Sequence, residues 1–266
     1  MIPLVKIESL KKSKKKGFYD VETSIGKYSI SENIIVRFTI LKEKEFTSEE
    51  FEKIISLNND EKIFNNVLNY ISYQMRTEAE IRKYLEKKEV REQYITKCIK
   101  ELKNLGYIDD ESYAKYLLSD IQKKNKGPKY LQQKMKEKGL NEKLIKEFVF
   151  KYSPDIEEEI LTLEINSLKD KNSNLPVKKQ KQRLMEKFIR DGFSQTIVFN
   201  VINHCDFTFN NDGKLQNDLD KILNSLNKDK YKDISSYELK NKVITKLLQK
   251  GYEYSDIKEL IKDFEF

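Results

Sequence analysis

One spacing of apolar residues occurs four times along the chain, and this repeat limits the possible folds more than any other feature of the sequence. The four copies are the segments Ile81–Ile99, Leu131–Val149, Leu184–Ile202 and Val243–Ile261. Every copy has apolar residues eight and four positions before a shared reference residue, and one, six, nine and ten positions after it. The four reference residues are Glu89, Gly139, Gly192 and Gly251. A repeated period of this length is typical of an array of structural repeats.

The spacing within each copy predicts two helices joined by a tight turn. Apolar residues four apart form a stripe on the first helix, and those after the reference residue form a stripe on the next. Three copies have glycine at the reference position, where a helix end favours a left-handed residue. The reference residues are 50, 53 and 59 positions apart, which leaves room for one more helix per copy. We therefore expect a mainly α fold, an elongated tandem array of four three-helix repeats.

Capping signals and prolines indicate where helices begin. Thr47–Glu50, Thr77–Glu80 and Ser235–Glu238 have the capping-box pattern, and Pro128 and Pro154 suit first helical turns. Loops are expected at residues 169–181 and 207–214, which contain Asn, Ser, Gly or Pro. On this basis the predicted repeats are residues 46–107, 108–153, 154–206 and 214–266, after an N-terminal region of residues 1–45.

The N-terminal region has a different pattern. Two short β-prone runs, Leu4–Glu8 and Phe18–Glu22, flank the basic segment Lys11–Gly17. This order predicts a short β-hairpin with a basic tip, followed by a first helix. The segment Glu32–Leu41 is rich in β-branched residues and fits either a strand or a helix.

Composition agrees with a helical protein and excludes several classes. Hydrophobic residues make up 38% and charged residues 36% of the chain, with 8 glycines and 4 prolines, which favours amphipathic helices over a compact α/β fold or a β-sandwich. No apolar run approaches eighteen residues, so we expect no membrane span. The N-terminus lacks the residue order of a signal peptide, and two cysteines are too few for a disulfide framework. These features predict a reduced, cytoplasmic protein.

The positive charge is concentrated in the middle of the chain. The net charge is +7, and residues 61–153 hold 21 Lys and Arg against 14 Asp and Glu, while the flanking parts nearly cancel. A local basic excess favours a polyanion or an acidic protein surface as partner. A set of solvated helix faces explains the same count, and charge alone does not separate these interpretations.

Three motifs in residues 68–152 go beyond the apolar pattern. They read Tyr73-Gln74-Met75-Arg76-Thr77-Glu78-Ala79-Glu80-Ile81, then Gly106-Tyr107-Ile108-Asp109-Asp110-Glu111-Ser112-Tyr113-Ala114, then Lys126-Gly127-Pro128 with Lys138-Gly139-Leu140. With these motifs the chain resembles the RecX family, most specifically in this stretch and more weakly over nearly its whole length. Gln74 stands where the family has Arg. Glu89 stands where the family has Gly, so the first turn is expected to form without a left-handed glycine.

The resemblance implies a regulator, mainly an inhibitor, of the RecA recombinase. It implies binding along the groove of the RecA–DNA filament and modulation of strand exchange, ATP hydrolysis and recombinational repair. Single- or double-stranded DNA is a further expected partner. We expect a monomer that binds no membrane, no cofactor and no small-molecule ligand.

The basic residues of the central region are the candidates for partner binding. The predicted set is Arg76, Arg82, Lys83, Lys87, Lys88, Lys97, Lys100, Lys103, Lys123, Lys124, Lys126 and Lys129. A contact to DNA is predicted at the hairpin tip, through Lys11, Lys12, Lys14, Lys15 and Lys16. For each of these side chains, solvation without a partner is the alternative.

The sequence shows no constellation of residues for catalysis or metal binding. His204 adjoins Cys205, but no second ligand pair has zinc spacing. The run Asp109–Glu111 fits helix capping better than acid–base chemistry, and Cys98 falls on an apolar repeat position. We therefore expect no enzyme activity. A general DNA- or RNA-binding helical protein and a scaffold for another acidic protein are the alternative functions.

Overall fold

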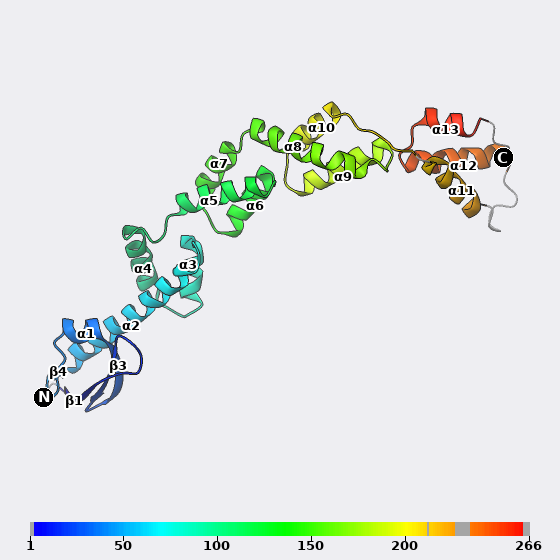
Figure 1. Cartoon of the computed structure of the whole chain (residues 1–266). Helices are drawn as coiled ribbons and strands as arrows, with labels where there is room; N and C mark the ends of the chain where they lie inside the picture. The colour runs from blue at the N-terminus through cyan, green and yellow to red at the C-terminus, as the bar shows by residue number, and fades with distance from the viewer. Residues whose placement is uncertain (1–2, 212, 227–234, 263–266) are drawn as a thin grey trace. The chain divides into compact units, whose positions relative to one another are not determined.

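The computed structural model describes residues 3–211, 213–226 and 235–262. The chain forms two compact units, Met1–Tyr113 and Ala114–Phe266, each described by itself. The N-terminal unit contains the strands and the first helices, and the C-terminal unit is helical over the residues described (Figure 1).

The N-terminal unit begins with a four-stranded antiparallel sheet. The strands are β1 (Leu4–Lys12), β2 (Phe18–Thr23), β3 (Gly26–Ser31) and β4 (Glu45–Thr47), in the order β3-β2-β1-β4. The predicted hairpin is confirmed as β1 and β2, and the sheet adds two strands that the sequence did not indicate. The segment Glu32–Leu41, which fitted either a strand or a helix, begins with the short helix α1 (Glu32–Arg37). The Ser31 side chain, at the end of β3, caps this helix.

Helix α2 (Ser48–Ser72) connects this sheet to the first helical repeat. It begins at Thr47 with the predicted capping box and packs Phe51 and Ile54 into the core of the sheet. The buried Asn58 amide accepts a hydrogen bond from the Ser31 N–H and donates to the Ser29 carbonyl, so it pairs backbone groups of edge strand β3. Further along, Val67 packs against α3 (Glu78–Glu86) and α4 (Glu92–Asn104).

The remaining helices follow in groups of three. The second group is α5 (Asp110–Lys123), α6 (Pro128–Glu137) and α7 (Glu142–Lys151), and α5 contains the boundary between the units. The third is α8 (Pro154–Lys169), α9 (Val177–Arg190) and α10 (Gln195–His204), with a short 3-10 turn, η1 (Asp170–Asn172), after α8. The fourth is α11 (Lys214–Leu226), α12 (Ser236–Gln249) and α13 (Tyr254–Leu260).

The repeat pattern corresponds to the cores of these groups. All residues eight and four positions before the reference residue are buried, and those after it are buried or partly buried. The turns have positive φ at Glu89 (58°), Gly139 (72°), Gly192 (91°) and Gly251 (94°). The helical repeat fold is thus confirmed, and Glu89 adopts the left-handed conformation without being glycine.

Two local expectations were wrong. The loop predicted at residues 169–181 ends at Pro176, because α9 begins at Val177. From the sequence we also expect Tyr107 to be a packing residue, as most aromatic residues of the repeats are, but it is 51% exposed in the turn between α4 and α5. The loop predicted at residues 207–214 includes residue 212, which lies outside the described residues. The predicted boundaries of the five domains remain a prediction.

Two of the reference glycines also form contacts between neighbouring groups in the C-terminal unit. A Cβ atom on Gly192 would lie 2.5 Å from the backbone nitrogen of Tyr130 at the start of α6. The same atom on Gly251 would lie 3.2 Å from the backbone nitrogen of Lys179 at the start of α9. In both cases the turn of one group packs against the first turn of the middle helix in the group before it.

Candidate functional site

The predicted basic residues lie in both units, so each set is described within its own unit. Eight of the twelve central residues are on or beside α3 and α4 in the N-terminal unit. The other four are at the end of α5 and the start of α6 in the C-terminal unit. Five hairpin lysines complete the candidates.

Several basic side chains of the first repeat form ion pairs within the repeat. The Arg82 guanidinium lies 2.5 Å from the Glu92 carboxylate, and Lys103 pairs with Glu78. These pairs are largely exposed, and such pairs contribute about 0–1 kcal/mol each. They hold α3 against the two ends of α4, and a partner would have to compete with them.

Arg76 lies in a column of stacked side chains. Its guanidinium is 4.1 Å from the centre of the Tyr70 ring, which stacks on Tyr84 at 4.4 Å with an interplanar angle of 6°. At the other end of the column, the ammonium of Lys88 lies 5.2 Å from the centre of the Tyr84 ring. Arg76 also approaches Glu80 at 3.7 Å and is only 17% exposed. Arg76 therefore stabilises the connection between α2 and α3, a role that the motif alone did not reveal.

Four lysines of the first repeat are exposed and make no ion pair with a described residue. They are Lys83, Lys87, Lys97 and Lys100. Lys87, the C-cap residue of α3, lies one turn after Lys83, and Lys97 and Lys100 are one turn apart on α4, so each pair shares a helix face. With Lys88, which is also exposed, they are the residues of the predicted set on this repeat that are accessible to a partner.

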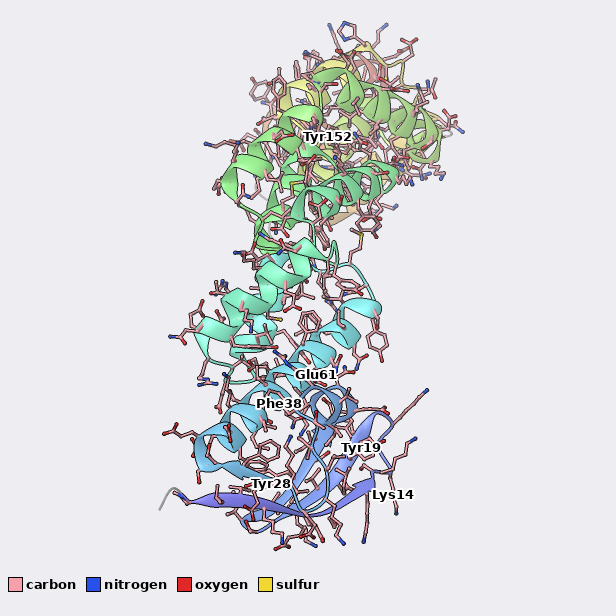
Figure 2. All side chains as sticks on the ribbon, turned by 90° about the vertical axis from the view of Figure 1, so that its left-hand side faces the viewer. Lys14, Tyr19, Tyr28, Phe38, Glu61 and Tyr152 are labelled. Carbon is pink, nitrogen blue, oxygen red and sulfur yellow. The ribbon has the colours of Figure 1, made fainter. Side chains whose placement is uncertain are left out.

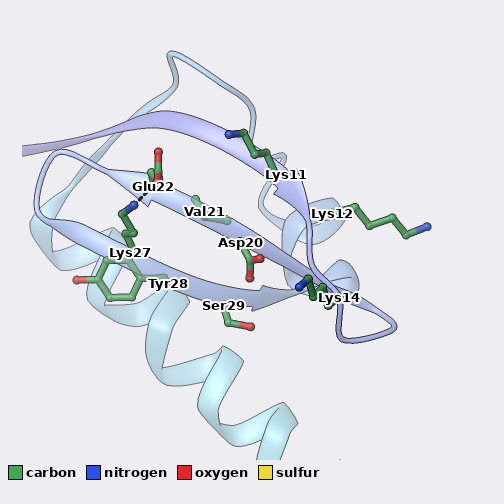
Figure 3. A pocket seen from close by; sticks show the side chains of 9 residues that line it. All are labelled: Lys11, Lys12, Lys14, Asp20, Val21, Glu22, Lys27, Tyr28 and Ser29. Carbon is green, nitrogen blue, oxygen red and sulfur yellow. Dashed lines mark ion pairs between the residues drawn. The ribbon is translucent and has the colours of Figure 1, made fainter.

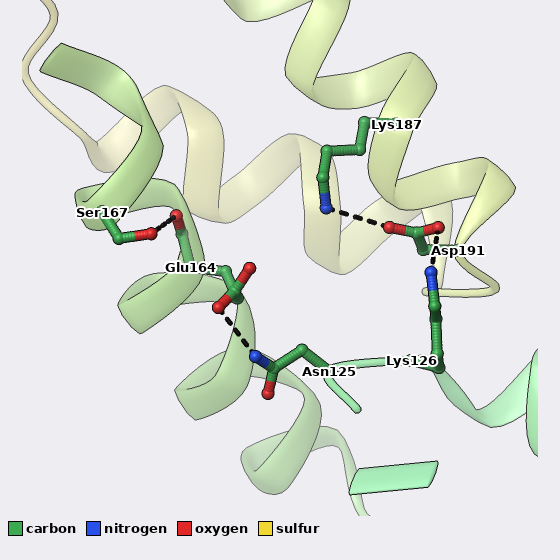
Figure 4. A network of polar contacts seen from close by, with 6 residues as sticks. All are labelled: Asn125, Lys126, Glu164, Ser167, Lys187 and Asp191. Carbon is green, nitrogen blue, oxygen red and sulfur yellow. Dashed lines mark hydrogen bonds and ion pairs between the residues drawn. The ribbon is translucent and has the colours of Figure 1, made fainter. Parts of the chain in front are cut away.

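Lys126 of the second repeat is used inside the C-terminal unit. Its ammonium lies 2.7 Å from the Asp191 carboxylate, which also accepts from Lys187 at 2.9 Å (Figure 4). Partial burial opposes ionisation of Asp191, but the hydrogen bonds from Lys126 and Lys187 outweigh it and lower the Asp191 pKa. The backbone N–H of Gly127 donates to the Asp191 carbonyl at 2.9 Å, so this network joins the second and third groups.

The other three residues of this set are at the surface. Lys124 pairs with Asp120 at 2.7 Å, one turn earlier on α5. Lys123 and Lys129 are exposed, and neither forms an ion pair within the described part of the chain. They are therefore the free cations of this predicted set.

Three of the five hairpin lysines line a shallow hollow on the outer face of the sheet. Lys11, Lys12 and Lys14 line it together with residues of β2 and β3, and its volume is about 560 Å³ (Figure 3). Lys14 lies at the periphery of the sheet (Figure 2). Lys15 instead folds over the Phe18 ring at 4.1 Å. Lys16 is exposed in the turn.

The sequence did not indicate the residues of β3 that line the hollow, among them Lys27 and Tyr28. Lys27 pairs with Glu22 at 2.5 Å across the two strands, and Tyr28 follows it on β3. Recognition of β3 as a returning strand would have found both.

The groups considered for catalysis have structural roles. Asp109 accepts hydrogen bonds from the Glu111 N–H at 2.9 Å and the Ser112 hydroxyl at 2.6 Å, so it caps α5 as expected. Asp110 accepts from the Glu78 N–H at 2.9 Å. His204 lies at the end of α10, with Nδ1 2.7 Å from the Asn200 carbonyl oxygen. Among the described residues no three His, Cys, Asp or Glu side chains are grouped to hold a metal ion.

Cys98 is a core thiol, as expected. It is 1% exposed, and burial raises its pKa to about 11, with a further contribution from the charge of Glu101. No described helix has both the length and the apolar character needed to cross a membrane.

Comparison with known proteins identifies the family. The model for "RecX, first three-helix domain" matches residues 64–102, which contain the end of α2, all of α3 and most of α4. The chain is 31% identical to the regulatory protein RecX of Staphylococcus aureus strains JH9 and MRSA252 over 269 residues, 99% of this chain and 96% of the relative. The chain belongs to the RecX family.

Two solved structures agree with a RecX fold. A crystal structure of regulatory protein RecX is 25% identical and has a TM-score of 0.59, covering 75% of this chain and all of that one. RecX from Lactobacillus salivarius, also 25% identical, has a TM-score of 0.52 over 55% of this chain and 96% of that one. The relatives and the first of these structures are named regulatory protein RecX.

Proposed function

We propose that this protein regulates the RecA recombinase, mainly as an inhibitor, by binding along the groove of the RecA–DNA filament. In this role it modulates strand exchange, ATP hydrolysis and recombinational repair in the cytoplasm. The observation that carries the proposal is the match over 99% of the chain to regulatory protein RecX. The repeated helical groups support it, because weak contacts from several repeats to successive filament subunits add to a strong total.

The exposed lysines of the first two repeats are the proposed contact residues. Lys83, Lys87, Lys97 and Lys100 make no ion pair with a described residue, and they would meet acidic groups of the filament. Lys123 and Lys129 extend this set in the second repeat. Arg76 and Lys126 act instead by holding the repeats in shape.

The test is an assay with the RecA protein of the same organism. The purified chain is added at stoichiometric amounts to filaments, and strand exchange and ATP hydrolysis are measured. We expect both rates to fall. Unchanged rates at stoichiometric amounts would contradict the proposed function.

A second candidate function, general nucleic-acid binding, is favoured by the hairpin hollow and its lysines. Binding through six to ten phosphate contacts alone weakens by about 10³–10⁵ between 50 and 200 mM salt. Regulation through protein contacts persists over this range. DNA binding that collapses with salt, without any effect on the recombinase, would favour the second function.

A further inference from the structure

The connection between α2 and α3 exposes two large apolar side chains. Tyr73 is 86% exposed and Met75 is 49% exposed, while the flanking Ile71 and Ile81 are partly or fully buried. Tyrosine and methionine are enriched in the contact surfaces of protein complexes. Since they lie two residues apart in one short segment, they form a candidate contact point.

This segment is held in place before any partner arrives. Arg76 is stacked on Tyr70, which is itself stacked on Tyr84, and Thr77 closes the segment with a capping box at the start of α3. Thr77 is fully buried. Because the backbone is already ordered, binding through Tyr73 and Met75 loses little conformational entropy.

The charges near the segment indicate what kind of surface it would meet. Lys88 forms the far end of the same stack, and Lys83 on α3 and Lys87 just after this helix are exposed. Glu78 and Glu80, beside the segment, are already paired with Lys103 and Arg76. An apolar pocket with carboxylates at its rim complements apolar anchors that are followed by a helix with exposed cations.

A nucleic-acid strand fits this segment less well than a protein does. The Arg76 guanidinium, the group best suited to phosphate, is occupied by Tyr70 and Glu80. Met75 offers no aromatic face on which a base could stack. Only Tyr73 could serve a strand, whereas a protein pocket uses both exposed side chains.

We propose that Tyr73 and Met75 form a preorganised anchor that inserts into an apolar, acid-rimmed pocket on a protein partner. The inference rests on the proposed function and deepens it, since that partner is the recombinase protein of the filament and not its DNA. Arg76, Tyr70 and Tyr84 are positioning residues that hold the anchor.

The experiment uses the full chain with the double substitution Tyr73→Ala/Met75→Ser. Affinity for RecA filaments and for DNA without RecA is measured at about 0.15 M salt. We expect filament affinity to fall at least about tenfold, equivalent to about 1.4 kcal/mol. DNA affinity should stay within about twofold. Tyr237→Ala is the matched control, because Tyr237 on α12 is 75% exposed and outside this segment; it should change neither affinity.

The changes in filament and DNA affinity separate the proposal from its alternatives. Equal losses of filament and DNA affinity would show that Tyr73 contacts nucleic acid and would overturn the proposal. Unchanged filament affinity of the double variant would also overturn the proposal. The proposed function would be unaffected by that result, provided that the wild-type chain binds filaments. If the wild-type chain fails to bind filaments, the proposed function fails and the inference fails with it. The midpoint of thermal unfolding, expected to be unchanged, shows that each variant is folded.

Discussion

In one of the repeat turns, the residue type does not suit the backbone conformation. The reference position has positive φ in all four copies, yet the first copy has Glu89 there with φ 58°. A left-handed conformation costs an L-residue with a side chain about 1–2 kcal/mol and costs glycine almost none. The first turn therefore carries backbone strain that the other three turns avoid.

Replacing this residue should stabilise the first repeat. We expect Glu89→Gly to raise the free energy of unfolding by about 1 kcal/mol, since glycine removes the left-handed penalty. Urea unfolding measures the change. The matched control is Glu86→Gly, at the exposed last residue of α3, which should lower stability by up to about 1 kcal/mol. A destabilised Glu89→Gly variant would show that the glutamate side chain contributes more than the strain costs.

The two cysteines should differ in reactivity. Burial raises the Cys98 pKa to about 11 and covers the sulfur, whereas Cys205 is partly exposed after α10. In the native protein at pH 8, a thiol reagent should label Cys205 and leave Cys98 protected, because the thiolate is the reactive form. Mass spectrometry of labelled peptides measures this. Fast labelling of Cys98 under native conditions would contradict its place in the core.

The raised pKa of Cys98 also gives a direction for stability against pH. The folded state holds the thiol protonated above its ordinary pKa of 9.0. Its contribution to stability is therefore complete below pH 9 and is lost as the pH rises from 9 towards 11. Cys98→Ser and wild-type unfolding curves at pH 8 and pH 10.5 measure this, and the gap between them should narrow at the higher pH.

At the scale of elements, the glycines of the repeat turns have two roles: they end a helix, and some of them allow a neighbouring helix to pack closely. The repeat pattern alone does not distinguish these roles. Every reference glycine ends a helix with positive φ, but Gly192 and Gly251 also allow a neighbouring helix to approach closely. At Gly192 the approach is closest, and the Lys126–Asp191–Lys187 network lies beside it. The contact between the second and third groups thus depends on a missing side chain.

A comparison of two glycines separates these purposes. A Cβ on Gly106 (φ 71°) meets no atom within 4 Å, so Gly106→Ala should cost about 1 kcal/mol from the left-handed conformation alone. Gly192→Ala adds overlap with backbone atoms of Tyr130 and should cost about 3 kcal/mol in total. Urea unfolding of both variants tests this. Equal costs would show that α6 moves away without penalty.

At the scale of the whole molecule, function is expected to depend on which cations remain free after folding. Both predicted sets contain residues held by internal carboxylates or rings and residues that are exposed. Only the exposed ones can be reversed in charge without disturbing the fold.

Charge reversal at a free pair should weaken recombinase regulation. We expect Lys83→Glu/Lys87→Glu to raise the concentration needed for half-inhibition of RecA strand exchange at least tenfold, since it places two anions on the proposed contact face. The control Lys258→Glu/Lys262→Glu changes the net charge equally, at exposed positions with the same spacing near α13. It should change this concentration by about twofold or less. Inhibition unaffected by the first variant would remove these lysines from the site while the family membership stands.

Much of the fold could be predicted because its information is local. The apolar positions of Ile81, Leu131, Leu184 and Val243 are set by helical periodicity, and all four are buried. The hairpin followed from two β-prone runs around a basic turn. Strand β4 has only three residues and pairs with β1, which lies far from it in the sequence. No local sequence pattern therefore predicted this strand.

The candidate site was less predictable, because the sequence shows which residues are charged but not which are free. By itself the sequence determined the four repeats, the basic central region and the absence of a catalytic motif, since periodicity and composition report these directly. Only the tertiary structure decided that Arg76 stacks in a tyrosine column, that Lys126 is held by Asp191, and that Tyr73 and Met75 stay exposed. The physical reason is that ion pairs, ring stacking and burial depend on distances between residues far apart in the chain, and only folding sets those distances.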